Sequence, residues 1–86
     1  MTVNFYGKIT DFTNSEKTFS PKEPSNIKGL FAELSDRYGE QFTSFLQSNE
    51  TCIILVNGKG IKLTGGPDTL LHPDDKIEIL PFVDAG

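Results

Sequence analysis

The sequence contains few of the residues that form covalent cross-links or metal centres. It has one cysteine, Cys52, and one histidine, His72, and it lacks tryptophan. A single cysteine allows no disulfide within the chain and cannot supply the four thiolates of a zinc or iron–sulfur site. The carboxylates are scattered along the chain in no metal-binding pattern. We therefore expect a protein that binds no metal and no cofactor of its own.

Basic charge and long apolar runs are also scarce. The chain carries 8 Lys and Arg against 12 Asp and Glu, a formal net charge of −4. An acidic protein has little attraction for nucleic-acid phosphates, but it suits basic grooves on partner proteins. No apolar run approaches the roughly 20 residues of a membrane span, and residues 1–8 lack the pattern of a signal peptide. We expect a cytoplasmic protein that binds neither nucleic acid nor membrane.

The residues that are present suffice for one small core. The length of 86 residues corresponds to a single domain, and the hydrophobic fraction of 36% includes seven Phe. Apolar residues alternate over residues 3–9, which predicts a half-buried strand. A short strand centred on Phe19 over residues 17–20 would complete a hairpin with it.

Helical periodicity follows after two prolines. An apolar stripe at helical spacing predicts a helix over residues 26–38, with Ser25 as its N-cap and Gly39 at its C-terminal end. The stripe consists of Ile27, Leu30, Phe31, Leu34 and Tyr38. Residues 40–49 repeat the 3–4 spacing with Phe42, Phe45 and Leu46, which predicts one or two further helical turns.

Strands dominate the second half. The continuous apolar run 52–56 predicts a strand buried on both faces. Asn57-Gly58 predicts a type I′ turn, with residues 59–63 as the return strand. Residues 76–82 alternate again and predict the last strand. This order of elements indicates an α+β fold with one main helix on one face of a mixed sheet, formed by residues 1–82, and a loose tail over residues 83–86.

Isolated motifs give no sign of internal catalysis. Gly58-x-Gly60 lacks the third glycine and the helix of a dinucleotide fingerprint. A catalytic pair of Cys52 and His72 is conceivable, but a thiol that opens an apolar strand behaves as a small hydrophobe, so structural roles are favoured for both. Asp74-Asp75 follows a proline, and a solvated turn is favoured there over acid–base chemistry.

Three segments together resemble the MoaD/ThiS family of sulfur carriers. They are residues 54–59 (ILVNGK), 68–77 (DTLLHPDDKI) and 79–81 (ILP). The likeness is strong over residues 52–86 and looser before them. Pro81 makes the chain look more like the small subunit of molybdopterin synthase than the thiamine carrier. The resemblance implies a β-grasp (ubiquitin-like) fold.

The resemblance also implies a mechanism in which the protein is a carrier and not an enzyme. An adenylating enzyme related to those that activate ubiquitin would use ATP to join the carboxylate of Gly86 to AMP. Sulfur would replace AMP to give a thiocarboxylate. The tail residues Val83, Asp84 and Ala85 would then carry Gly86 into the large subunit of molybdopterin synthase, where sulfur passes to a pterin precursor.

The tail departs from the family pattern at one important position. The penultimate residue is Ala85 where the family has glycine. Three explanations stay open: the activating enzyme accepts Ala-Gly, carrier function is lost, or a second glycine follows the given chain. Two other functions stay open: a β-grasp module whose tail never reacts, and a ubiquitin-like modifier joined through Gly86 to lysines. In each case Leu80, Pro81 and Phe82 would form the partner-binding surface, unless Phe82 closes the core.

Overall fold

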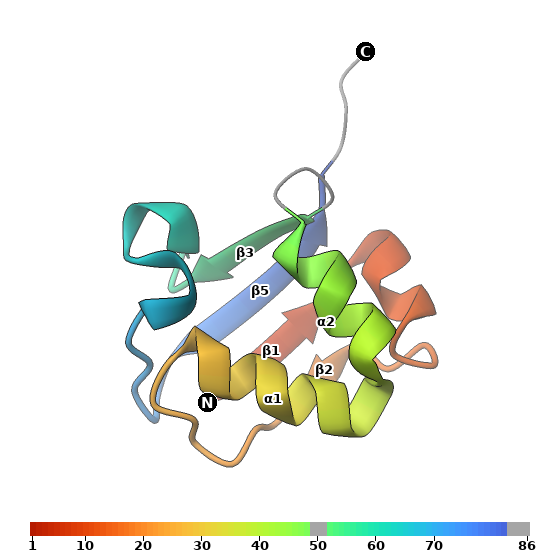
Figure 1. Ribbon diagram of the computed structural model, residues 1–86, viewed down its shortest axis with the longest axis horizontal. Helices are drawn as coiled ribbons and strands as arrows, with labels where there is room; N and C mark the ends of the chain where they lie inside the picture. Colours follow the sequence, from red (N-terminus) through yellow and green to blue (C-terminus); the bar gives the residue numbers. More distant parts are fainter. Residues whose placement is uncertain (49–51, 83–86) are drawn as a thin grey trace.

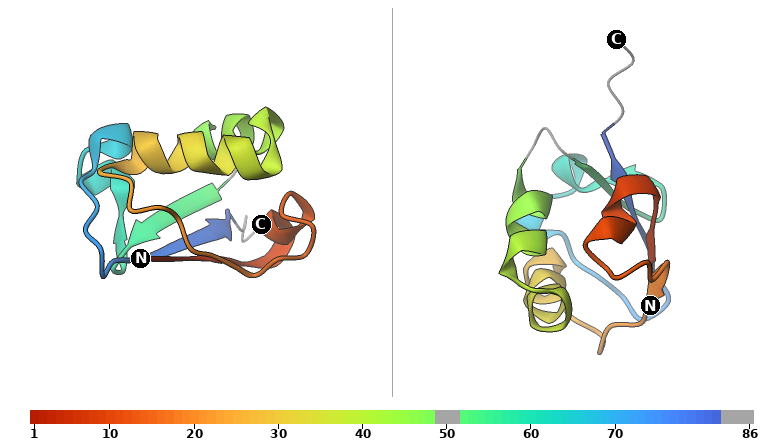
Figure 2. Two further views of the ribbon diagram at one scale, coloured as in Figure 1. Left: turned by 90° about the horizontal axis from the view of Figure 1, so that it is seen from below. Right: turned by 90° about the vertical axis from the view of Figure 1, so that its right-hand side faces the viewer.

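A computed structural model describes residues 1–48 and 52–82 of the chain. Its centre is a five-stranded mixed sheet in the order β2-β1-β5-β3-β4. The strands are β1 (Thr2–Phe5), β2 (Thr18–Phe19), β3 (Cys52–Val56), β4 (Lys59–Gly60) and β5 (Lys76–Pro81). Two helices, α1 (Ile27–Tyr38) and α2 (Glu40–Gln47), cover one face of this sheet, as Figures 1 and 2 show.

The strand β5 lies in the middle of the sheet. It runs parallel to β1, with Val3 opposite Ile77, and antiparallel to β3, with Ile54 opposite Ile79. The parallel pair joins the two ends of the described chain, and the short strands β2 and β4 form the two edges. This sheet with its covering helices has the predicted β-grasp architecture.

The first strand is shorter than its sequence pattern predicts. β1 ends at Phe5, and a 3-10 helix, η1 (Gly7–Asp11), replaces the second half of the predicted strand. Gly7 has a φ of +57°, which turns the chain out of the sheet. Ile9 is nevertheless fully buried. The alternating pattern extended the predicted strand to Ile9 because Ile9 is buried, but its burial comes from the 3-10 helix η1 and not from a strand.

The helix α1 forms where its apolar stripe predicts it. Its N-cap is Asn26 and not Ser25: the Asn26 side-chain oxygen accepts a hydrogen bond of 2.8 Å from the Gly29 N–H. At the other end, Gly39 has a φ of +101°, and its N–H donates to the Ser35 carbonyl at 2.8 Å. The helix α2 begins at once and spans eight residues.

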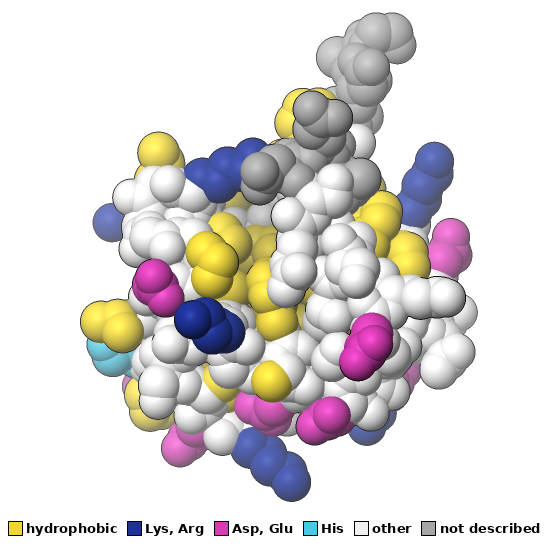
Figure 3. Space-filling view, in the orientation of Figure 1, with side chains coloured by type: hydrophobic (Ala, Val, Ile, Leu, Met, Phe, Trp, Pro, Cys, Tyr) yellow, Lys and Arg dark blue, Asp and Glu magenta, His cyan; other side chains and the backbone are white. Residues whose placement is uncertain are grey.

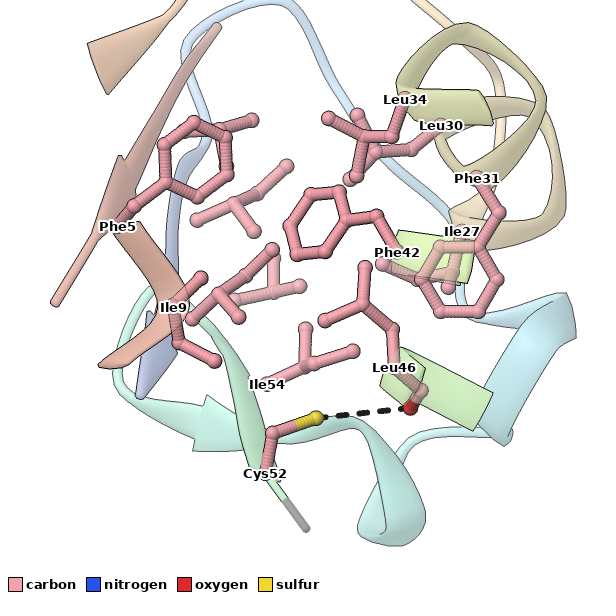
Figure 4. Close-up of a cluster of buried hydrophobic side chains, with 14 of the residues drawn as sticks. Phe5, Ile9, Ile27, Leu30, Phe31, Leu34, Phe42, Leu46, Cys52 and Ile54 are labelled. Atoms are coloured by element: carbon pink, nitrogen blue, oxygen red, sulfur yellow. Dashed lines mark hydrogen bonds between the residues drawn. The ribbon is translucent and has the colours of Figure 1, made fainter. Parts of the chain in front are cut away.

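The core lies between the helices and the sheet (Figure 4). Phe42 of α2 is fully buried at its centre and contacts a ring on either side, Phe5 at 5.9 Å and Phe12 at 5.4 Å between centroids. Figure 4 also shows the Cys52 thiol, which donates to the Leu46 carbonyl at 3.5 Å and so ties β3 to α2. Cys52 thus has the structural role that the sequence favours.

The strand β3 was expected to be buried on both faces, and this is wrong. Ile54 points into the core, but Ile53 is 39% exposed because the helices cover only one face of the sheet. The predicted type I′ turn is confirmed by a φ of +52° at Asn57 and +85° at Gly58. The predicted return strand ends after two residues and continues as the 3-10 turns η2 (Ile61–Leu63) and η3 (Gly66–Asp68).

Among the described residues, no helix is both long and apolar enough to cross a membrane.

Candidate functional site: the root of the C-terminal tail

The last strand, β5, ends at Pro81, directly before Phe82 and the C-terminal tail (Figure 1). Ile77 and Ile79 of β5 are fully buried, whereas Glu78 and Leu80 lie on the opposite face and are half-buried, as their alternation predicts. Hydrogen bonds hold β5 on both sides, to β1 and to β3. The tail therefore begins on the best-supported strand of the domain.

A contact between Pro81 and Gly7 fixes this root. A Cβ atom on Gly7 would lie 3.0 Å from Cγ of Pro81, closer than side chains normally approach. The proline ring therefore packs against the bare backbone of Gly7, where the chain leaves β1. Proline also lacks an N–H, so it belongs where a strand pairing ends.

Phe82 follows Pro81 and is 56% exposed. The prediction that this ring stays partly exposed is confirmed, and the alternative that it closes the core is wrong. Ile53 lies directly opposite Leu80 across the two strands. Leu80, Ile53 and Phe82 together form an apolar surface beside the tail, which we call the root patch.

A polar neighbour borders the root patch on the open face of the sheet. The Tyr6 hydroxyl donates to Oε2 of Glu78 at 2.9 Å. This hydrogen bond, together with desolvation, raises the pKa of Tyr6, which stays a neutral donor at physiological pH. An apolar centre with a satisfied polar margin is the usual composition of a protein interface.

The tail residues expected to carry the chemistry, Val83, Asp84, Ala85 and Gly86, lie outside the described residues. Their roles stay predictions, as do the partner-binding roles of Leu80, Pro81 and Phe82. The structure shows that Leu80 and Pro81 end β5 and that Phe82 follows directly.

The residues Cys52 and His72 are not brought together. Cys52 opens β3 opposite Pro81, whereas His72 lies beside Asp75 at the other end of the strand, where Val56 pairs with Ile77. The His72 side chain is 73% exposed. A catalytic Cys–His pair is thus excluded, and no cluster of His, Cys, Asp and Glu within residues 1–48 and 52–82 is arranged to hold a metal ion.

Asp75 corrects the prediction of a solvated turn. The residue is only 8% exposed, and its carboxylate accepts hydrogen bonds of 2.8 Å from the His72 N–H and from the Asn57 side-chain amide. Burial raises the pKa of Asp75, but these hydrogen bonds and the nearby His72 and N-terminal charges outweigh burial and lower it. Asp75 is thus an ionised structural residue, distant from the root patch.

A groove that the sequence did not predict adjoins the root patch. It has a volume of about 430 Å³ and is lined by residues of α2, β3 and the turns η2 and η3, and by Phe82. The sequence hints at this groove only through Gly60 and Gly66-Pro67, which line it. These small residues leave space beside β3, where a longer β4 would have packed.

Comparisons with known proteins assign the family. The model of the ThiS family matches residues 3–86. No curated protein sequence matches the chain. Among solved structures, a chain of the complex of subunits 1 and 2 of the molybdopterin-converting factor from Helicobacter pylori is 28% identical, with a TM-score of 0.65, covering 99% of this chain and 96% of that one.

Two other solved structures share the fold. The small archaeal modifier protein 1 (SAMP1) from Methanosarcina acetivorans is 25% identical, with a TM-score of 0.70 and coverage of 99% and 94%. The BexX/CysO complex of Amycolatopsis orientalis contains a chain with a TM-score of 0.82, 19% identity and coverage of 99% and 98%. The protein described here belongs to the ThiS family of ubiquitin-like sulfur carriers, whose members are small carrier proteins without catalytic activity of their own.

Proposed function

We propose that the protein carries sulfur on Gly86 and serves as the small subunit of a molybdopterin synthase. The observation that supports this most is the family match, which runs through the β-grasp domain to residue 86 and so includes the tail. The 28% identity to a chain of the molybdopterin-converting factor complex favours this pathway over others in the family.

The chemistry takes place on partner proteins. The Gly86 carboxylate, which is ionised at neutral pH, attacks the α-phosphorus of ATP in an adenylating enzyme and releases pyrophosphate. A sulfur donor then displaces AMP from the acyl-adenylate and leaves a thiocarboxylate. In the synthase, the thiocarboxylate sulfur forms a bond to the pterin precursor, and water returns the end of the tail to a carboxylate.

The dimensions of the tail suit this role. The four residues after Phe82 reach at most about 13–14 Å when extended. That length carries the terminal carboxylate into a buried active site while the folded domain stays outside. Glycine has no Cβ, so the reacting end fits a narrow channel.

Intact-mass spectrometry of the protein purified from its native cell tests the proposal. We expect a fraction whose mass exceeds that of the chain by the difference between sulfur and oxygen. This added mass should disappear after treatment with an alkylating reagent that captures thiocarboxylates, and a new adduct should replace it. A single unmodified mass under conditions of active molybdopterin synthesis would contradict the proposal.

A second function is a ubiquitin-like modifier, favoured by the 25% identity to SAMP1. In that case Gly86 forms an amide with lysines of other proteins. The same spectra separate the two functions, because a modifier appears in conjugates of higher mass that retain a Gly86–lysine bond. A non-reactive interaction module would show neither species.

A further inference from the structure

The groove beside the root patch is a mostly apolar hollow along the part of β3 that β4 leaves unpaired, and Ile53 and Ile54 from the two faces of the sheet both line it. Figure 3 shows hydrophobic side chains gathered in the hollow between α2 and the η2–η3 segment. Six elements or segments contribute a lining residue each: Phe31, Leu46, Ile54, Ile61, Pro67 and Phe82. The lining also includes three exposed polar residues, Gln47, Ser48 and Lys62.

The short strand β4 accounts for this opening. β4 pairs with β3 only at Leu55 and Val56, and after Gly60 the chain turns away into η2. Ile54 therefore has a partner in β5, Ile79, but none in β4 on the other side of β3. A hollow with mostly apolar walls remains, which favours an apolar side chain as the group that enters it.

The groove and the tail meet at Phe82. This residue lines the groove and is also the last described residue before the tail. A protein whose active site receives Gly86 must approach Phe82 to within the roughly 13–14 Å that four residues can span. The surface of that protein around its tail channel therefore comes to lie over the mouth of the groove.

The tail cannot fill the groove itself. Its apolar side chains are those of Val83 and Ala85, which are small beside a volume of about 430 Å³. Interfaces gain much of their affinity from one or two large apolar or aromatic side chains that enter such pockets. The size and lining of the groove match an anchor of that kind.

We propose that the groove receives a large apolar side chain of the adenylating enzyme and so docks the domain independently of the tail. This inference rests on the proposed function for the identity of the partner. The groove supplies affinity, and the tail supplies the reacting group.

Two pairs of variants test the docking. Gly60→Phe adds a ring at the Ile53 wall of the groove, because Gly60 lines the groove and pairs with Leu55, which shares the face of Ile53. Gly60 has an ordinary φ of −64°, and a Cβ there meets nothing within 4 Å. Lys59→Phe, its control, adds the same ring one residue away, at an exposed position that does not line the groove. Gln47→Phe fills the groove from α2, and Ser44→Phe is its control on the same helix.

Steady-state ATP–pyrophosphate exchange with the adenylating enzyme is the measurement. We expect the groove-filling variants to raise the KM for the carrier at least about tenfold, about 1.4 kcal/mol, with kcat and melting temperature unchanged. The two control variants should behave as the wild type. An unchanged KM for both groove-filling variants, with active wild type, would overturn the inference and leave the proposed function standing.

A chain that lacks Gly86 separates docking from chemistry. It should compete with the wild type as an inhibitor of exchange, and adding Gly60→Phe to it should abolish that inhibition. Self-association of the wild type that Gly60→Phe disrupts in sedimentation would assign the groove to a second copy and overturn the inference. Absence of any exchange with the wild type would instead contradict the proposed function, and the inference with it.

Discussion

At the scale of single residues, Asp75 connects segments that are distant in sequence. Its carboxylate binds the His72 N–H and the Asn57 amide, and the Asn57 oxygen accepts from the Lys76 N–H at 3.0 Å. The hairpin turn after β3 is thereby fastened to the start of β5. The burial of Asp75 was not predictable from the sequence, because Pro73-Asp74-Asp75 is typical of a solvated turn. Only the fold places Asn57 against Asp75.

This carboxylate should make stability dependent on pH. The pKa of Asp75 is lowered below its ordinary 3.8 in the folded protein, so its contribution is complete above that value and is lost as the pH falls through the lowered pKa. Asp75→Ala should reduce the free energy of unfolding at pH 7 by about 1–3 kcal/mol, because two donors lose their acceptor. Urea denaturation at several pH values measures both effects.

The dependence of stability on pH tests the role of Asp75 more sharply than the loss of stability at pH 7. Asp75→Ala should lose less stability than the wild type between pH 5 and pH 2, since the titrating group is absent. Asp74→Ala, at the exposed neighbouring position, is the matched variant. Equal acid sensitivity of wild type and Asp75→Ala would show that other carboxylates govern the transition.

Phe82 is the second residue whose role a single change can establish. Its side chain is 56% exposed at the root of the tail, so Phe82→Ala should leave the melting temperature nearly unchanged. If the ring is an interface anchor, binding to the synthase or the adenylating enzyme should weaken at least about tenfold, about 1.4 kcal/mol. Titration calorimetry measures this, and full affinity in a stable variant would remove Phe82 from the interface.

At the scale of elements, the predictions succeeded where the side-chain period was long and uninterrupted. The stripe of α1 lies against the sheet as expected, with Ile27, Leu30 and Leu34 fully buried. The 3-10 segments were missed, since three to five residues are too few to establish a period. Their positions depend instead on tertiary contacts, such as Pro81 against Gly7.

Leu34 provides the test of the main helix. Its side chain is fully buried between α1 and the sheet, so Leu34→Ala should lower the free energy of unfolding by about 2–5 kcal/mol. Asp36→Ala, at an exposed position on the same helix, should cost far less. Denaturant melts measure both, and a loss under about 0.5 kcal/mol for Leu34→Ala would contradict the packing of α1.

At the scale of the whole molecule, folding and chemistry occupy different parts of the chain. The described core residues all lie between Val3 and Ile79, whereas the reacting group of the proposed mechanism is Gly86. The sequence alone suggested this division through the family resemblance. It did not reveal the groove, because Phe31, Leu46 and Pro67 come from separate segments and meet only in the fold.

Deleting Gly86 should therefore separate the two properties. We expect an unchanged free energy of unfolding, because no residue of the described core is touched, and complete loss of ATP–pyrophosphate exchange with the adenylating enzyme. Replacing Ala85 with glycine is the companion variant, and it should leave exchange active. Exchange that persists without Gly86 would exclude the terminal carboxylate as the adenylated group.

The central position of β5 also has a mechanical consequence. A partner that draws on the tail applies force along β5, and the ladders to β1 and β3 then bear the load together in shear. Bonds loaded side by side must break nearly at once, whereas a strand peeled from a sheet edge loses them one after another. The domain should therefore resist traction from its C-terminal end far better than traction that peels β2 or β4 from an edge.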